Sequence, residues 1–405
     1  MTSWVDELAN VFKLLPAFIV CRFKCVGKLF DYTTNPKFCA EQASHMLSLG
    51  DQHIFTSPGS HIIYDSGIHL LHLLHNGPSD GVPKDFLDFI EQSGQIISSW
   101  NGLVVVRCRR KNPFSYFICN PVTSSWTPLT SPCPNYYVEG TLNIIIIPSS
   151  TPTANDYRLL SMIRGPSIFK HYYVLKEYNP VGDYWQVINP NMGLGDRNVI
   201  LGQPAIVNNW LYFMSDNYEY SFFGSDRFYL PYVVAYSLHD HTSVLLDLPI
   251  EVLQEPFDGK FGVYTWGSRW TSRECLCLVR FINSSFSVWT CADSTSVIAT
   301  WVQILHITKD ELGLSGESFS LFSMYVEPIR NHYTVVNGDC FIFATRDKIY
   351  AYNINGPYPW KFCQVGINES RTNVILVPYS STFRIVHRGH SSSFKEFLAN
   401  NLIRR

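Results

Sequence analysis

Three histidines stand at intervals of three in the segment IHLLHLLHNG, and imidazole nitrogens are good zinc ligands. If the segment is a strand, only His69 and His75 point to the same face and His72 points away, because side chains alternate along a strand. If it is a helix, all three share one stripe, but the Asn-Gly-Pro that follows ends the helix at once. Since the sequence offers no companion ligand motif, we expect structural or solvent-facing histidines and no bound metal.

A second ligand-like group, His239-Asp240-His241, lies between the strand-like runs YVVAYSL and TSVLLDLP. This position predicts an outer turn, which Asp240 forms instead of binding a metal. Cys275 and Cys277 lie two residues apart, so on a strand they share a face but are too close for a comfortable disulfide. Neither group has the Cys-x-x-Cys spacing of a metal or redox site.

A basic cluster, Arg107, Arg109, Arg110 and Lys111, is followed by Asn-Pro, which places it at a strand end and turn. Two interpretations fit: recognition of an acidic segment of a target, or an exposed solvated loop, which we favour. The sequence contains no phosphate-binding glycine loop, nucleophile elbow or metalloprotease helix. We therefore expect a non-catalytic protein without a cofactor.

The composition describes a folded chain with a large core. Of 405 residues, 46% are hydrophobic, 15% aromatic and only 16% charged, which argues against long disorder. The 31 basic and 33 acidic residues nearly balance, so no global charge favours nucleic acid or an anionic membrane. The longest uncharged apolar run, around Ile144–Ile147, is far shorter than the roughly 20 residues that cross a bilayer. Eleven irregularly spaced cysteines, and a start unlike a signal peptide, favour a reducing compartment.

The N-terminal region predicts short helices, because apolar residues recur there at the spacings of an amphipathic helix. The first set ends before Pro16 and comprises Val5, Leu8, Phe12 and Leu15. The second set ends before an Asn-Pro pair and comprises Ile19, Phe23, Val26 and Phe30. Fewer than about 40 residues rarely supply a sufficient core, so these helices need a partner or the next domain.

From about Gln95 the sequence changes to short alternating runs separated by Gly, Asn, Pro or Ser, a pattern typical of strands. Several runs end in a turn that is followed by a tryptophan: Trp126, Trp185, Trp301 and Trp360. The intervals are 59, 116 and 59 residues, and Leu246 divides the longer one. Asn120 and Asn179 each precede their tryptophan by six residues, so the turn and the period repeat together.

A repeat of roughly 59 residues with several strands predicts the blades of a β-propeller. Five blades fit between Gln95 and Gly366, and a sixth could combine HIIYD and IHLLHLL, near residues 60–75, with NVILVPY and TFRIVH from the C-terminal region. Such a mixed blade closes the ring and leaves no free edge. We expect a mainly β protein with six blades, or seven as an alternative; stacked β-sandwiches are the competing fold. The kelch-type Gly-Gly pair and the Trp-Asp pair are missing, so the propeller would be divergent.

The opening segment SWVDELANVFKLLPAFIVCRFKCVGKLFDYTTNPKF resembles the F-box, a helical module whose usual pattern is LPxDLLxEIFxRLPxxxLxRxRxVCKxWxxLxxxPxF. The matching positions keep their order and spacing without a gap: Asp6, Leu8, Phe12, Leu15, Pro16, Arg22, Phe23, Val26, Lys28, Pro36 and Phe38. The segment departs from the pattern at the first Leu-Pro, replaced by Ser3-Trp4, at Gly27 and at Phe30.

The remaining chain is similar to the plant F-box-associated domain. SWNGLVVV matches its first strand, and FICNPVTSSWTPL matches its Asn-Pro-x-Thr turn, its tryptophan and its Leu-Pro-like end. AIVNNWLYFM and VVAYSLHDHTSVLLDLP also look like that family. Together the resemblances imply an F-box-like helical domain at 1–45, a connecting segment at 46–94 that contributes strands to ring closure, and a kelch-like propeller at 95–395.

This combined resemblance implies the substrate-recognition subunit of a Skp-cullin-F-box ubiquitin ligase, located in the nucleus, the cytoplasm or both. The helices would dock a Skp-type adaptor and through it a cullin, and the propeller would bind a target protein for ubiquitination. The residues expected to bind the adaptor are Leu8, Phe12, Leu15, Pro16, Ile19, Phe23 and Val26. Within the aromatic loop Ser215–Tyr229, the residues that could bind the target are Tyr218, Tyr220, Phe222 and Phe223. No nucleic acid or membrane partner is expected.

Two other functions stay open. The altered start, Ser3-Trp4, fits a propeller scaffold or transcriptional partner that has lost adaptor binding. A propeller enzyme, such as an oxidase or a glycan hydrolase, is the third possibility, and it would need the convergent ligands or paired acids that we do not find in the sequence.

Overall fold

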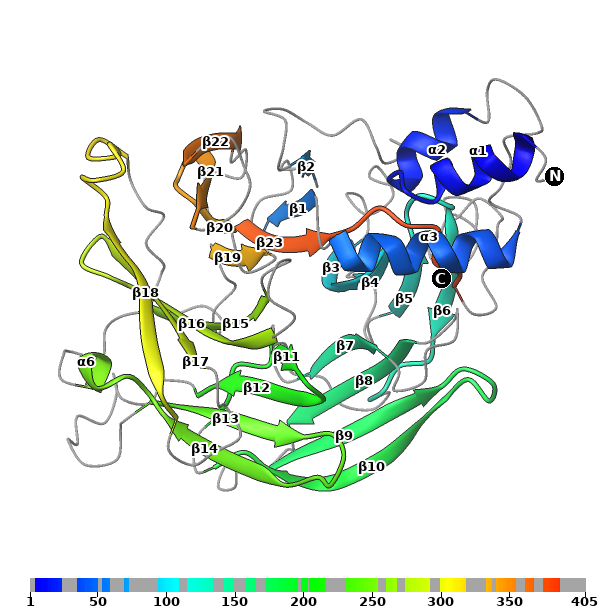
Figure 1. The fold of residues 1–405 in the computed structure, drawn as a ribbon. Coiled ribbons are helices and arrows are strands. Elements are labelled where there is room, and N and C mark those ends of the chain that lie inside the picture. Colours follow the sequence, from blue (N-terminus) through cyan, green and yellow to red (C-terminus); the bar gives the residue numbers. More distant parts are fainter. Residues whose placement is uncertain are drawn as a thin grey trace.

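The structure, a computed structural model, is mainly β with few helices (Figure 1). It describes residues 4–23, 35–49, 53–58, 69–72, 94–108, 115–133, 142–148, 157–164, 172–195, 198–202, 204–215, 231–253, 260–267, 274–291, 299–317, 333–336, 340–354, 361–367 and 374–386.

The N-terminal region forms short helices, as the sequence predicts. They are α1 (Trp4–Phe12), α2 (Ala17–Phe23) and α3 (Pro36–Leu49). Pro16 lies between α1 and α2. Because a proline disfavours the helical conformation of the residue before it, α1 and α2 do not join into one helix. At the start of α3, Asn35 Oδ1 accepts hydrogen bonds from the backbone N–H groups of Lys37 and Phe38, at 3.0 and 3.2 Å. An asparagine cap followed by proline is a strong helix start, which explains why α3 begins here.

The strands form a β-propeller with five blades, each a four-stranded antiparallel sheet of consecutive strands. Blade 1 contains β3 (Gly94–Trp100), β4 (Leu103–Cys108), β5 (Ser115–Asn120) and β6 (Ser125–Leu129). Blade 2 contains β7 (Leu142–Pro148), β8 (Tyr157–Arg164), β9 (Tyr172–Asn179) and β10 (Tyr184–Gly193). Blade 3 contains β11 (Ala205–Val207), β12 (Trp210–Met214), β13 (Tyr232–Ser237) and β14 (Ser243–Asp247), followed by the short helix α6 (Ile250–Leu253). Blade 4 contains β15 (Lys260–Gly267), β16 (Glu274–Ile282), β17 (Ser285–Cys291) and β18 (Trp301–Thr308). Blade 5 contains β19 (Tyr333–Val336), β20 (Cys340–Ala344), β21 (Lys348–Asn353) and β22 (Phe362–Ile367).

Five blades are one fewer than the six predicted. Between blades 5 and 1 lies a three-stranded sheet in the order β2-β1-β23, with β1 at His53–Pro58, β2 at His69–His72 and β23 at Val374–Tyr379. It contacts both neighbours, because β23 packs against β19 and β3 (Figure 1). The sheet does combine N-terminal and C-terminal strands, and β2 and β23 fall within the predicted IHLLHLL and NVILVPY, but TFRIVH does not join it. The predicted HIIYD lies outside the described residues, and β1 was not predicted. Residues 381–386 form no strand and bind elsewhere.

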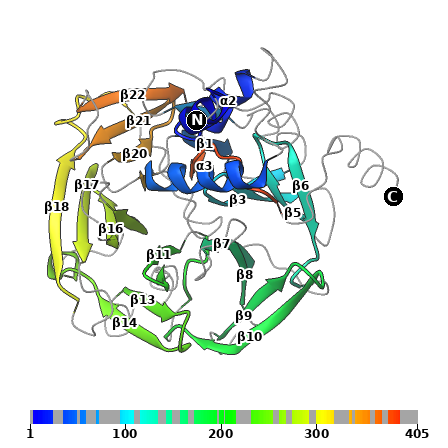
Figure 2. The ribbon, with the colours of Figure 1, turned by 45° about the vertical axis from the view of Figure 1, so that its right-hand side comes forward.

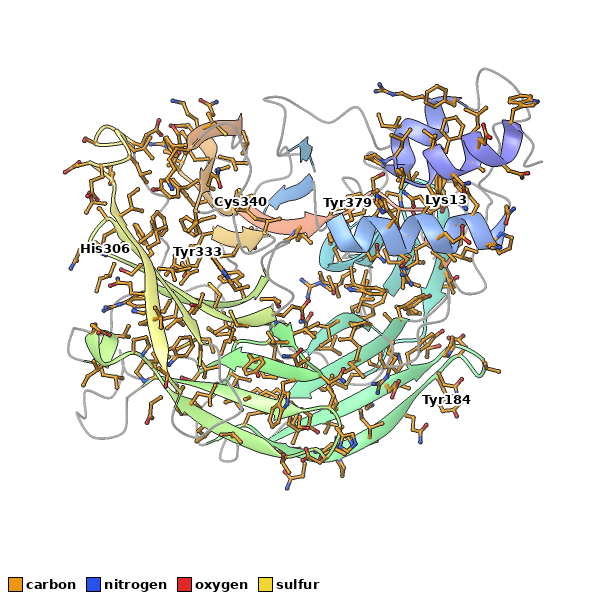
Figure 3. The ribbon with its side chains drawn as sticks, viewed as in Figure 1. Lys13, Tyr184, His306, Tyr333, Cys340 and Tyr379 are labelled. Carbon is orange, nitrogen blue, oxygen red and sulfur yellow. The ribbon has the colours of Figure 1, made fainter. Side chains whose placement is uncertain are left out.

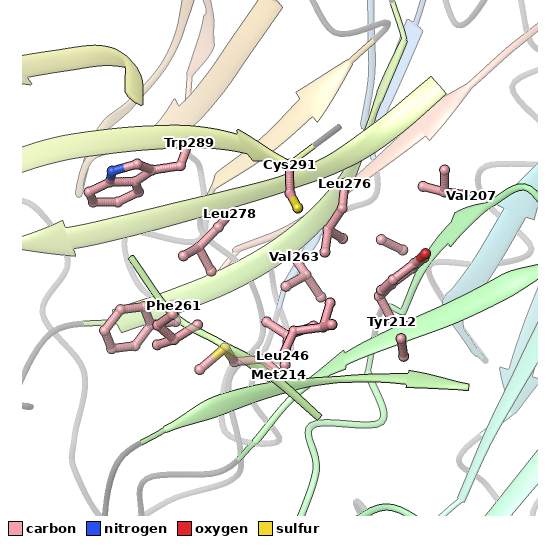
Figure 4. Close-up of a cluster of buried hydrophobic side chains, with 14 of the residues drawn as sticks. Val207, Tyr212, Met214, Leu246, Phe261, Val263, Leu276, Leu278, Trp289 and Cys291 are labelled. Carbon is pink, nitrogen blue, oxygen red and sulfur yellow. The ribbon is translucent and has the colours of Figure 1, made fainter. Parts of the chain in front are cut away.

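The hydrophobic core lies between the blades, where the faces of adjacent sheets meet. Figure 4 shows the core cluster between blades 3 and 4, in which Tyr212 and Leu246 of blade 3 face Val263 and Leu278 of blade 4. Similar clusters fill the spaces between blades 1 and 2, 2 and 3, and 4 and 5. Each blade therefore buries both of its faces, which is why strands such as β4 read as continuous apolar runs.

The predicted tryptophan repeat marks the outermost strand of blades 1, 2 and 4, whereas β14 of blade 3 carries Leu246 instead. Trp185, near the start of β10, donates a hydrogen bond from Nε1 to the backbone oxygen of Thr130 beside blade 1, at 2.6 Å. Trp301, at the start of β18, donates to the oxygen of Asp247 at the end of blade 3, at 2.7 Å. Trp126 is buried in β6, whereas Trp360 lies outside the described residues. Two of the repeated tryptophans thus join neighbouring blades at the rim of the ring.

Candidate protein-interaction sites

One side of the N-terminal helices presents apolar side chains to solvent. Trp4 is 60% exposed, Val11 52% and Leu14 55%, and Phe23 of α2 is also exposed. Trp4, Leu8 and Val11 follow the four-then-three spacing that places residues on one helix face. We call Trp4, Leu8, Val11 and Leu14 the α1 stripe. Exposed apolar residues at helical spacing are typical of a surface that binds another protein.

The opposite side of these helices is buried within the protein itself. Phe12, Ala17 and Val20 pack in one cluster with Phe38 of α3 and with Phe383 from the C-terminal region. The ring of Phe23 stacks on that of Phe12 with 5.0 Å between centroids. Lys13, which directly follows α1 (Figure 3), also forms an ion pair with Glu41 of α3. The helices therefore share one buried cluster with Val122 of blade 1 and with Phe383 of the C-terminal region.

The contact is made by the residues that follow β23, 380–386, which we call the strap. The backbone N–H of Ala17 donates to the oxygen of Ser381 at 3.1 Å. Gln42 of α3, which is fully buried, accepts a hydrogen bond from the N–H of Phe383 and donates one to the oxygen of Leu15, both at 3.0 Å. The strap thus binds α2 and α3, and Gln42 in turn binds the connection between α1 and α2.

The other side of the strap binds blade 1. Asn120 Nδ2 donates to the backbone oxygens of Thr382 and Arg384, at 3.0 and 2.7 Å. Thr382 Oγ1 donates to the oxygen of Asn101 in the β3–β4 turn, at 2.8 Å. Gly102 in this turn has a φ of +86°, and a Cβ there would lie 1.9 Å from Thr382 Oγ1, so only glycine fits. The helices are held on blade 1 through the strap.

These contacts define two faces of the ring. The helices and the strap contact the face that carries the β3–β4 and β5–β6 turns, and Figure 2 shows α3 lying next to β1 and β3. We call this the helix face. Neighbouring strands of a blade are antiparallel, so successive connections between them lie at alternate faces of the ring. The connection between the second and third strands of a blade therefore lies at the face opposite the helix face.

The residues expected to bind the adaptor differ in exposure. Leu8, Leu15, Pro16 and Ile19 are half-buried, and Phe23 is exposed. Phe12 is 4% exposed and belongs to the contact with the strap. Val26 lies outside the described residues. Their role in adaptor binding stays a prediction. Trp4, Val11 and Leu14 were not in the expected set, although their place on the outer face of α1 could have been found by extending the helical spacing to Trp4.

The residues proposed to bind a target, Tyr218, Tyr220, Phe222 and Phe223, all lie outside the described residues. The residues that flank their loop are described. The N–H of Ser215, after β12, donates to the oxygen of Tyr232 at 2.9 Å, and the N–H of Tyr232 donates to Ser215 Oγ at 2.9 Å. Since these residues join the second and third strands of blade 3, they lie on the face opposite the helices.

No group of three potential metal ligands is found among the residues that the structure describes. His69 and His72 lie on β2, paired with Thr56 and His53 of β1, and His75 is outside the described ranges. Asp240 forms the turn between β13 and β14, as predicted: its Oδ1 accepts hydrogen bonds from the N–H and Oγ1 of Thr242, at 3.3 and 2.9 Å. Hydrogen bonds with Ser237 and Thr242 lower the pKa of Asp240 to about 2.

Arg107 of the basic cluster and the cysteine pair, Cys275 and Cys277, both lie on strands. Arg107 is only 5% exposed in β4, so it is not part of a solvated loop, whereas residues 109–111 lie outside the described part. The preference for a solvated loop was wrong at this position because the strand continues one residue beyond it. Cys275 and Cys277 carry free thiols on β16, as expected, and burial raises the pKa of both. Raised thiol pKa values disfavour the reactive thiolate.

None of the described helices has the length and apolar character needed to cross a membrane. No family model matches the chain, and no curated protein matches it. Solved structures resemble the chain only distantly. A mutant lectin of Aleuria aurantia in complex with alpha-methyl-L-fucoside is 8% identical, with 76% of this chain and 88% of that chain covered and a TM-score of 0.42.

Two other solved structures are similarly distant. The PQQ-bound aldose sugar dehydrogenase of Streptomyces coelicolor is 12% identical, with 67% and 80% of the two chains covered and a TM-score of 0.36. The Dos1 propeller is 8% identical, with 76% and 66% covered and a TM-score of 0.31. At these scores the likeness carries no argument about binding or activity, and the β-propeller assignment rests on the blades described above.

Proposed function

We propose that this protein is the substrate-recognition subunit of a Skp-cullin-F-box ubiquitin ligase, present in the nucleus, the cytoplasm or both. The helices dock a Skp-type adaptor, the propeller binds a target protein, and other subunits carry out the transfer of ubiquitin. The chain then contributes proximity and orientation and no reacting groups. The observation that carries this proposal is the α1 stripe, because an apolar helix face that the protein leaves in solvent fits a protein partner.

The strap adds support from geometry. A receptor must hold its target at a fixed position relative to the ligase. A flexible joint between the adaptor-binding helices and the propeller would allow the target to move away from that position. Here Gln42, Phe383 and Asn120 link the helices through the strap to blade 1. The residues flanking the aromatic loop lie on the opposite face, so adaptor and target would not compete for the same surface.

The test is co-purification of a Skp-type adaptor with the tagged full-length chain. Val11→Asp combined with Leu14→Asp places two charges on the α1 stripe, where both side chains are more than half exposed, so the fold should survive. Val302→Asp is the matched control, because Val302 is 57% exposed on β18, far from the helices. We expect adaptor with the parent and the control, and at least tenfold less with the double variant. Equal recovery from all three would refute docking on the α1 stripe.

A substitution at Leu15 and Pro16 would be a poorer test. Leu15 packs against the buried cluster, and its oxygen accepts the hydrogen bond from Gln42. A charge at this position would disturb the contact with the strap as well as any contact with an adaptor, so loss of binding would have two explanations.

One observation favours a second function, a propeller scaffold or transcriptional partner that no longer binds the adaptor. Phe12 was expected to be an adaptor anchor, yet its side chain packs with Phe38 and Phe383. In this alternative the helices are only a cap on blade 1. If no adaptor is recovered with a folded parent, as judged by circular dichroism, the scaffold function is the better one.

A further inference from the structure

The turn that binds the strap in blade 1 has a counterpart in blade 2. Asn120–Trp126 reads NPVTSSW, and Asn179–Trp185 reads NPVGDYW. In each turn the asparagine Oδ1 accepts hydrogen bonds from the N–H groups two and three residues later, at 2.9 and 3.4 Å in blade 1 and at 2.9 and 3.1 Å in blade 2. Each turn also has one residue in the left-handed region, Ser124 with φ 53° and Asp183 with φ 55°. The two turns therefore share one backbone form.

In blade 1 this turn binds the strap, a segment of the same chain that forms neither helix nor strand. The two hydrogens of Asn120 Nδ2 reach the oxygens of Thr382 and Arg384, which are alternate residues of the strap. Val122 belongs to the cluster that contains Phe383, the residue between them. The turn thus offers one amide donor to two alternate carbonyl groups, and one apolar side chain to the aromatic residue between them.

In blade 2 the same surface faces solvent. Val181 is 77% exposed, whereas its equivalent in blade 1, Val122, is 8% exposed. Tyr184 replaces Ser125 of blade 1 and covers the asparagine: Asn179 Nδ2 donates to the Tyr184 hydroxyl at 3.2 Å. A Cβ on Gly182 would lie 2.3 Å from the Tyr184 ring, so the ring lies directly over the turn. This tyrosine is 49% exposed, at the tip of the β9–β10 hairpin (Figure 3).

We propose that this blade 2 turn, Asn179–Tyr184, binds a segment of a partner protein that resembles the strap: two alternate carbonyl groups that face the turn, with an aromatic residue between them. The two carbonyl oxygens of the partner take the place of the Tyr184 hydroxyl on Asn179 Nδ2, and the aromatic side chain packs on Val181. Removing the exposed valine and an aromatic ring from water favours the contact, and the amide selects a backbone that presents two carbonyl groups to one side. Tyr184 satisfies the amide until the partner binds. The site needs no adaptor, so it is independent of the ligase function proposed above.

The probe is a fluorescent peptide with the sequence of residues 380–388, SSTFRIVHR, which contains the strap. Its binding to the full chain is measured by anisotropy. Val181→Asp charges the apolar contact, and Asn179→Asp keeps the oxygen that closes the turn while removing the amide donor. We expect each variant to bind at least tenfold more weakly, and Val302→Asp to bind as the parent does. Tyr184→Phe should bind more tightly because the competing hydroxyl is gone.

The result that would overturn the proposal is a peptide affinity that neither Val181→Asp nor Asn179→Asp changes. That outcome would show that the peptide replaces the strap on blade 1, since only blade 1 keeps an intact turn in these variants. Failure of the folded parent to bind would overturn it as well. A peptide with alanine in place of its phenylalanine should lose binding in every variant, which tests the requirement for an aromatic side chain.

Discussion

The side chain of Gln42 accepts a hydrogen bond from the backbone N–H of Phe383, 341 positions later in the chain, at 3.0 Å. Through its other atom the same side chain donates to the oxygen of Leu15. One buried glutamine in α3 therefore joins the first two helices to the C-terminal strap. This contact explains how helices too short to be stable alone are held in place.

Replacing this glutamine with a nonpolar residue of similar size should weaken the whole contact. In Gln42→Leu, the N–H of Phe383 and the oxygen of Leu15 lose their partner in a buried setting, which costs about 1–3 kcal/mol of unfolding free energy. Urea denaturation of the full chain measures this. Ser44→Ala, at an exposed position of the same helix, is the control and should change little. Equal midpoints for both variants would contradict the role given to Gln42.

Truncation of the strap's aromatic side chain should separate the helices from the propeller. Phe383 is fully buried, so Phe383→Ala leaves a cavity and should cost about 3–5 kcal/mol. Because the cavity lies between the helices and blade 1, limited proteolysis should release the N-terminal helices before the propeller is cut. Val302→Ala serves as an exposed control. If the blades are digested as early as the helices, the loss is global and the strap is not a separate joint.

The two tryptophan contacts at the rim should stabilise the ring independently. Trp185→Phe and Trp301→Phe each remove one hydrogen bond to a neighbouring blade, worth about 0.5–1.5 kcal/mol. Since the contacts lie in different blade pairs and share no partner, the effects of the two changes should add in the double variant. Thermal unfolding of the four proteins forms the cycle, and a large coupling between the sites would contradict independent joints.

A pH dependence is expected at the junction between blades 4 and 5. Burial tends to raise the pKa of Glu317, but hydrogen bonds from Lys348, Tyr350 and Thr345 outweigh it and lower the pKa below 4.5. A carboxyl group with a lowered folded pKa stabilises the protein above its unfolded pKa, and that contribution is lost as the pH falls through the folded pKa.

Glu317→Gln should therefore flatten the fall of unfolding free energy between about pH 5 and pH 3, measured by urea denaturation at several pH values. Tyr350→Phe removes one of the three donors and should give an intermediate slope. Identical slopes for the parent and Glu317→Gln would show that the lowered pKa contributes nothing to folding.

The repeat was predictable because a local pattern produces it. Each blade needs a turn before its outermost strand, and in blades 1 and 2 an Asn-Pro turn followed by tryptophan forms it, at Asn120 and Asn179. The contact of N-terminal with C-terminal strands was also predictable, since a ring has to be closed. The count of blades was not, because the strands that form the closing sheet carry no tryptophan repeat.

The strap was not predictable from its own residues. TFRIVH alternates polar and apolar side chains, as a strand does, and the sequence predicts a strand there. Burial does not follow this alternation, because Thr382 and Arg384 are buried as well as Phe383, and the partners of the segment are helices and turns that are distant in the sequence. Nor does any local pattern reveal which face of α1 is covered, since the burial of Phe12 depends on that same distant segment.

The route of the chain through the ring also sets the order of assembly during synthesis. Residues 374–386 supply both the inner strand of the closing sheet and the strap, and they are the last of the described residues to leave the ribosome. Until residues 374–386 emerge, the closing sheet lacks β23, and the N-terminal helices lack their contacts with the strap. The helices therefore gain their contacts with the strap only on chains translated through Val386, so a product that stops before Ser381 lacks the contacts that hold the helices on blade 1.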